Sequence, residues 1–65
     1  MKLTDTQRYQ IKLIKKAIRQ ELKYVPRGQG DGVNQHLKIR ELNWFITEIK
    51  EGRDVTQELR GRGIN

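Results

Sequence analysis

Residues 4–25 read TDTQRYQIKLIKKAIRQELKYV, and this stretch predicts a long helix. Thr4 and Gln7 fit a capping box, in which each side chain bonds to the backbone N–H of the other residue. Pro26 disfavours helical geometry at the residue before it, so we expect the helix over about residues 4–24. One face carries apolar residues three or four positions apart, the period of a helix: Ile11, Ile14, Ile18, Leu22 and Val25.

Residues 26–32 hold three glycines and the only proline, a composition that predicts a flexible loop. Beyond it, we expect a second amphipathic helix over about residues 35–51, ending at Gly52, because glycine suits a left-handed position after a helix. An alternation of apolar and polar residues over 33–39 keeps a short strand or β-hairpin in the connecting segment as the alternative. The second helix has its own apolar face: Ile39, Leu42, Phe45, Ile46 and Ile49.

Asp54 fits the start of a short third helix over about residues 55–60, followed by an Arg/Gly tail over 60–65. The expected fold class is therefore all-α, a two-helix antiparallel hairpin with a short third C-terminal helix. Sixty-five residues allow one small domain, 1–65. Because so short a chain buries few aliphatic side chains, we expect a marginal monomer that forms a homo-oligomer or joins a larger assembly.

The net charge of +6 lies entirely in the first part of the chain. Residues 1–27 hold eight Lys or Arg against two acidic residues, whereas residues 28–65 hold six residues of each sign. Such an asymmetry favours a polyanionic partner for the first helix.

Six cations of the first helix fall within a sector of about 100° on a helical wheel. Like charges one turn apart cost roughly 0.2–0.5 kcal/mol per pair, and a face that serves only solubility usually mixes signs. We interpret this sector as a site for the phosphate backbone of DNA or RNA; a merely solvated face is the alternative. Further contacts are expected from Arg27 in the loop and from Arg60 and Arg62 in the tail. The sector consists of Arg8, Lys12, Lys15, Lys16, Arg19 and Lys23.

Familiar nucleic-acid modules do not fit the chain. A helix-turn-helix needs a turn of about 3–4 residues, and the predicted loop is longer. In the second helix, the cations at positions 38, 40 and 50 are offset in number by the acids at positions 41, 48 and 51. We therefore expect binding that is led by the backbone, with little reading of base sequence. A membrane-surface role is not expected, because the apolar face of the first helix has a partner face and lacks central aromatic anchors.

Leu37 and Trp44 lie on the second helix opposite its isoleucine face. Tryptophan is a favoured anchor of protein interfaces, so this pair is a candidate protein-contact or self-association patch. The alternative is that Val55, Leu59 and Ile64 fold back and cover the pair, since large exposed apolar patches are unusual.

No catalytic centre is expected. The chain has no Cys and no Ser, and His36 is its only histidine, so neither a metal-ligand set nor a nucleophile with its base is apparent. We therefore expect no enzyme activity, no cofactor and no small-molecule substrate. The lack of Cys and the short apolar runs favour a cytoplasmic protein.

Two helices, a connecting turn and an Arg-rich tail within 65 residues are similar in architecture to the small head-completion proteins of tailed phages. The resemblance implies a structural adaptor that docks into a larger assembly. The second functional hypothesis is accordingly an assembly adaptor, or an inhibitor of a larger partner, whose basic helix meets an acidic protein surface.

Overall fold

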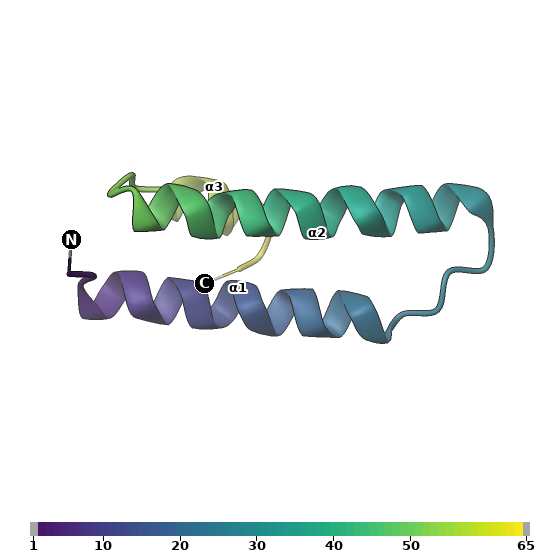
Figure 1. The fold of residues 1–65 in the computed structure, drawn as a ribbon, viewed down its shortest axis with the longest axis horizontal. Coiled ribbons are helices and arrows are strands. Elements are labelled where there is room, and N and C mark those ends of the chain that lie inside the picture. The colour runs from purple at the N-terminus through teal and green to yellow at the C-terminus, as the bar shows by residue number, and fades with distance from the viewer. Residues whose placement is uncertain (1, 65) are drawn as a thin grey trace.

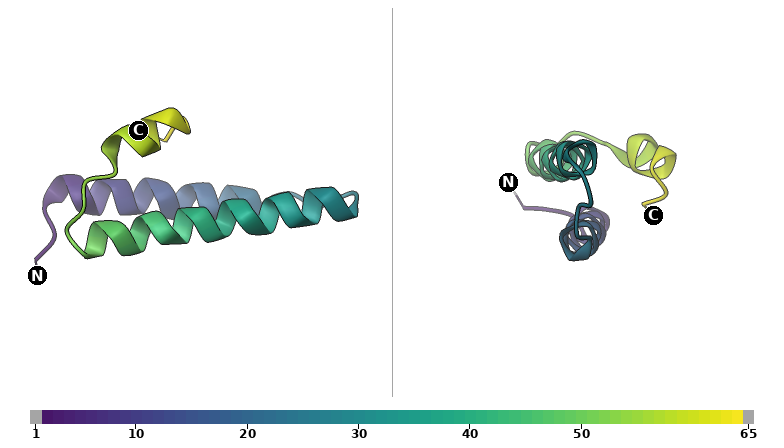
Figure 2. Two further views of the ribbon diagram at one scale, coloured as in Figure 1. Left: turned by 90° about the horizontal axis from the view of Figure 1, so that it is seen from above. Right: turned by 90° about the vertical axis from the view of Figure 1, so that its right-hand side faces the viewer.

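The computed structural model describes residues 2–64, without the side chain of Gln29, and this part of the chain forms three helices. They are α1 (Asp5–Lys23), α2 (Gln29–Lys50) and α3 (Thr56–Gly61). The two long helices lie side by side and antiparallel (Figure 1). The short α3 lies against one side of this hairpin (Figure 2). No strand occurs within residues 2–64, and the predicted all-α hairpin with a short third helix is confirmed.

The first helix begins and ends as its sequence predicts. The Thr4 backbone N–H donates to Gln7 Oε1 at 2.8 Å, and the Gln7 backbone N–H donates to Thr4 Oγ1 at 3.1 Å, which completes the capping box. α1 ends at Lys23, three residues before Pro26. Local signals therefore predict both boundaries of this helix.

The second helix begins six residues earlier than predicted, at Gln29. The expected loop over 26–32 is therefore wrong from residue 29 onward, and the strand alternative over 33–39 is wrong because those residues are helical. Tertiary hydrogen bonds offset the poor helix propensity of the glycines in this turn. Gln35 Nε2 donates to two carbonyls at the end of α1, those of Glu21 at 2.6 Å and Tyr24 at 2.9 Å.

An additional bond across the turn stabilises the start of α2. Asp31 stands in the first turn, where the helix dipole favours a carboxylate, and it accepts a hydrogen bond from the Tyr24 hydroxyl at 3.1 Å. This hydrogen bond and the charge of Asp31 raise the pKa of Tyr24. The connection between the long helices is correspondingly short.

The end of α2 and the end of α3 use the same motif. Gly52, with φ of 90°, donates to the Ile49 carbonyl, and the next backbone N–H, of Arg53, donates to the Glu48 carbonyl. This is a Schellman motif, as expected from glycine at that position. Gly63, with φ of 74°, repeats it after α3 and turns the chain back.

The predicted tail over 60–65 is thus folded through residue 64, and Ile64 packs against the core. Asn65 lies outside the described residues. The third helix starts one residue later than expected, at Thr56, whose backbone N–H and hydroxyl both donate to Asp54. These bonds lower the pKa of Asp54 below its ordinary value.

The core is concentrated in the half of the hairpin that α3 covers. Leu22 and Val25, expected on the apolar face of the first helix, are 63% and 76% exposed. At that end α2 offers Gly32 and Gln35 instead of large apolar side chains, and α3 does not reach it. The buried apolar residues are Ile11, Ile14, Leu42, Phe45, Ile46, Ile49, Val55 and Leu59.

Candidate nucleic-acid interface

The six cations of α1 lie on the side of the hairpin that faces away from α3. Helix α1 meets α2 through Ile11 and Ile14, and it meets α3 through Gln10, whose Nε2 donates to Thr56 Oγ1 at 2.9 Å. At about 100° per residue, Gln10 precedes Ile11 by one step, whereas the cationic sector begins about 40° after Ile11. We call this side of the hairpin the open side; it faces the reader in Figure 1.

The cations that we call the basic face are all exposed, and within residues 2–64 none of them forms an ion pair. Glu21, the acidic residue in the body of α1, is half-buried and lies on the opposite flank of the helix, at about 280°. One guanidinium, that of Arg8, donates to the Leu3 carbonyl at 3.3 Å. The positive charge of the face is therefore available to an external anion. The basic face consists of Arg8, Lys12, Lys15, Lys16, Arg19 and Lys23.

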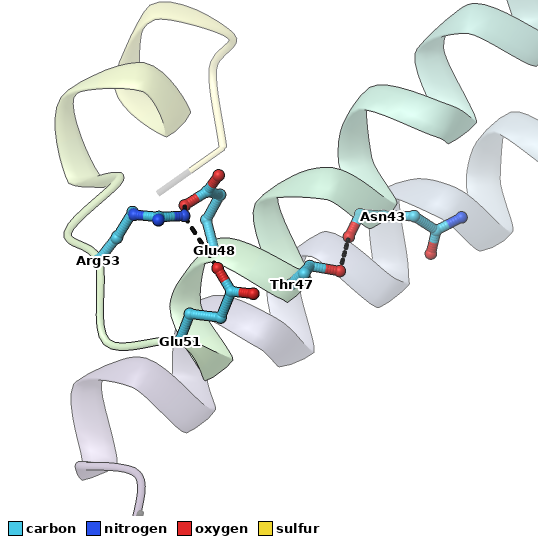
Figure 3. Close-up of polar contacts among 5 residues, drawn as sticks. All are labelled: Asn43, Thr47, Glu48, Glu51 and Arg53. Carbon is cyan, nitrogen blue, oxygen red and sulfur yellow. Dashed lines mark hydrogen bonds and ion pairs between the residues drawn. The ribbon is translucent and has the colours of Figure 1, made fainter.

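Two acidic residues of α2, Glu41 and Glu48, and Glu51 at its end pair with arginines from the C-terminal segment. Arg53 pairs with the half-exposed Glu51 at 2.9 Å and with Glu48, which is only 8% exposed (Figure 3). The hydrogen bond and the charge of Glu48, with a smaller contribution from Glu51, raise the pKa of Arg53. Arg62 pairs with Glu41. The three acids that were expected to offset the cations of α2 are thus each paired with an arginine of the C-terminal segment, and Glu48 and Glu51 share Arg53.

Two cations of α2 consequently extend the basic face, although they are absent from the set predicted from the sequence. Arg40 and Lys50 are exposed, and on the helical wheel they fall on the open side, away from the residues that contact α3. Asn43 and Thr47, also exposed, lie between them on the same side. The open side therefore presents two adjacent helices with cations and neutral polar groups. Local periodicity does not predict this arrangement, because the arrangement depends on where Arg53 and Arg62 lie after the chain folds back.

Two of the three remaining predicted cations, Arg60 and Arg62, lie with α3, away from the basic face. Arg62 lies 4.8 Å from the centroid of the Phe45 ring and donates to the Glu58 carbonyl at 3.1 Å, so it has a structural role beside its ion pair. Arg60 is exposed on α3, on the opposite side of the hairpin. Arg27 is exposed in the connection between α1 and α2.

The predicted protein-contact residues are uncovered. Leu37 and Trp44 are each 54% exposed. The alternative that the C-terminal residues cover them is wrong: Val55 and Leu59 are buried in the core, because α3 packs on the Phe45 side of α2. Trp44 meets Phe45 edge to face, with ring centroids 5.3 Å apart.

His36, the only histidine, is exposed on α2. No group of three potential metal-ligating side chains occurs within residues 2–64. In the same part of the chain, no helix has the length and apolar character that a membrane crossing requires. No protein-family model matches the chain, and no significant match was found among curated proteins or solved structures.

Proposed function

We propose that this protein is a non-enzymatic, regulatory accessory protein of the cytoplasm that binds nucleic acid through the phosphate backbone. The observation that carries the proposal is the basic face: six exposed cations on one side of α1, with no carboxylate paired to any of them within residues 2–64. Clustered Lys and Arg on one helix face are the electrostatic footprint of phosphate binding. Arg40 and Lys50 of α2 enlarge that footprint.

The dimensions of the open side favour contact with phosphates over contact with base edges. From Arg8 to Lys23 the basic face spans 15 residues of helix, or about 22 Å at 1.5 Å per residue. That length matches roughly six base pairs of duplex at 3.4 Å each. The molecule measures 20 Å across its second axis, whereas the major groove is about 12 Å wide. The two-helix surface therefore rests on the backbone rather than entering the groove.

The proposal is tested by reversing charge on one side of the molecule at a time. Lys15→Glu with Arg19→Glu changes two exposed residues of the basic face, so we expect binding to a labelled DNA or RNA duplex to weaken by at least about tenfold, ~1.4 kcal/mol. The loss should be similar for different base sequences, because phosphate contacts position a protein without specifying a sequence. Fluorescence anisotropy at fixed salt measures the affinity.

The matched control reverses two exposed cations that do not belong to the basic face. Lys38→Glu with Arg60→Glu makes the same change in net charge on the α3 side. Binding should stay within about threefold of the unmodified protein, under ~0.7 kcal/mol. Equal losses in both double variants would show that overall charge, and no particular face, governs binding, and would contradict the proposal.

A second candidate function is supported by the exposed apolar residues Leu37 and Trp44. In this reading the protein is an assembly adaptor, of the kind that the phage head-completion architecture suggests, and α1 docks on an acidic protein surface. The Lys15→Glu, Arg19→Glu variant separates the two candidates. An adaptor would lose a protein partner in a pull-down while the unmodified protein shows no saturable nucleic-acid binding at physiological salt.

A further inference from the structure

One edge of α2 carries three exposed apolar side chains in a line, and we call this line the apolar stripe. Val33 is 59% exposed, and Leu37 and Trp44 are each 54% exposed. On the helical wheel they fall within about 40° of one another, and Arg40 lies beside them. Together the four positions are spaced 4, 3 and 4 residues apart, which is the spacing of a seam between two packed helices. Neither α1 nor α3 occupies this seam.

The area that the molecule leaves exposed is larger than its size requires. The accessible surface is 5220 Å², whereas a compact monomer of 7.7 kDa exposes about 4,300 Å². The excess of roughly 900 Å² belongs to the molecule as a whole, and it is as large as the ~800 Å² that one partner contributes to a standard protein interface. The elongated shape, 41 × 20 × 15 Å, produces this excess, because half of the hairpin is only two helices wide.

Charge identifies what can cover the apolar stripe. Residues 28–65 have no net charge, and on the helical wheel the stripe lies roughly opposite Leu42, Ile46 and Ile49, which pack in the core. A second copy can therefore approach through α2 while the six cations of α1 in one copy stay about two helix diameters, roughly 20 Å, from those of the other copy. That separation exceeds the Debye length of ~8 Å at physiological salt, so the repulsion is screened. We infer that the apolar stripe is a homodimer interface, covered by the same stripe of a second copy.

Two-fold symmetry allows the α2 helices of the two copies to pair either parallel or antiparallel. When the two-fold axis is perpendicular to the helices, the α2 helices pair antiparallel, and Leu37 of each copy lies against Trp44 of the other. This orientation also opposes the two helix dipoles, whereas parallel pairing would align them. In the antiparallel dimer both open sides point the same way. The aliphatic stem of Arg40 packs along the seam while its guanidinium reaches the open side.

Dimerisation is tested on the purified full chain without nucleic acid, so the result is independent of the proposed function. Sedimentation equilibrium from about 1 μM to about 1 mM should show a rise from 7.7 kDa to twice that mass. Trp44 is the only tryptophan, so its fluorescence should shift to shorter wavelength over the same concentration range. Leu37→Lys places a charge in the seam and should weaken the dimer at least about tenfold, ~1.4 kcal/mol.

Asn43→Lys is the matched control, because it adds the same charge to an exposed position on the same helix, about 100° from the centre of the stripe. It should leave the dissociation constant within about threefold of the unmodified protein, under ~0.7 kcal/mol. A monomer with unchanged Trp44 emission up to about 1 mM overturns the inference. So does a dimer that Leu37→Lys and Asn43→Lys weaken equally. Circular dichroism on both variants verifies that the helices are intact.

Discussion

The two sides of the hairpin use charge in opposite ways. On the side that α3 covers, Arg53 and Arg62 pair with Glu48 and Glu41 of α2, and Arg53 also pairs with Glu51 just after the helix. On the open side the cations of α1 and α2 have no acidic partner within residues 2–64. Along the sequence, the acidic residues of α2 offset its basic residues in number. In the fold, Glu41 and Glu48 pair with C-terminal arginines, whereas Arg40 and Lys50 lie on the open side. The short C-terminal segment therefore does more than complete the core, because it removes negative charge from the surroundings of the basic face.

The largest expected effect is on stability, and it distinguishes a residue under α3 from its neighbour on the exposed edge of α2. Phe45 is 1% exposed under α3, so Phe45→Ala should cost about 3–5 kcal/mol, a large part of the stability of a small domain. Its neighbour Trp44 is half exposed, and Trp44→Ala should cost no more than about 1 kcal/mol in the monomer. Urea unfolding followed by circular dichroism at low protein concentration measures both. Similar losses of stability in the two variants would show that Trp44 belongs to the core as much as Phe45 does, and would contradict the prediction.

A smaller effect tests the neutralisation of the acids. Arg53→Met removes the cation beside the nearly buried Glu48, so the melting temperature should fall more than in Glu51→Gln, which changes a half-exposed carboxylate. Adding Glu48→Gln to Arg53→Met should restore part of the loss, because a neutral amide needs no cation. Thermal unfolding of the unmodified protein, the single variants Arg53→Met, Glu51→Gln and Glu48→Gln, and the double variant completes the comparison. If the change in melting temperature of the double variant equals the sum of the changes in the two single variants, Arg53 and Glu48 are not coupled, and the prediction is contradicted.

The smallest effect concerns the start of α3. The pKa of Asp54 is lowered in the folded protein by its bonds from Thr56, so the carboxylate stabilises the fold at pH values above its ordinary pKa of 3.8. That contribution is lost as pH falls below this value and the carboxylate is protonated. The difference in melting temperature between the unmodified protein and Asp54→Ala should therefore shrink between about pH 6 and pH 2. A constant difference would show that the charge of Asp54 is irrelevant.

The elements governed by local signals could be predicted from the sequence. The capping box at Thr4, the stop before Pro26 and the glycine after α2 each act within a few residues, and all three are found in the structure. The start of α2 could not be predicted, because its first turn is stabilised by Gln35, which bonds to the end of α1 14 residues earlier in the chain. The helix propensity of residues 29–32 favours a loop, but tertiary hydrogen bonds stabilise the helix there.

The candidate site was predictable only in part, for the same reason. Periodicity placed the six cations of α1 on one face, and the structure leaves that face exposed. The contribution of Arg40 and Lys50 was hidden, because nearby acids in the sequence suggested that they were offset. Only the path of residues 53–62 shows that those acids are paired on the opposite side. Leu22 and Val25 show the converse limit: a correct helical period does not reveal where the partner surface ends.

The most direct test of phosphate binding by the basic face is the salt dependence of affinity for a DNA duplex. If four cations of α1 meet phosphates, the logarithm of the binding constant should fall against the logarithm of salt concentration with a slope near −3.6 per bound chain, at about −0.9 per contact. The Lys15→Glu, Arg19→Glu variant should flatten that slope by roughly two contacts, and the Lys38→Glu, Arg60→Glu control should retain it. A slope near zero, or no saturable binding at physiological salt, would contradict the account.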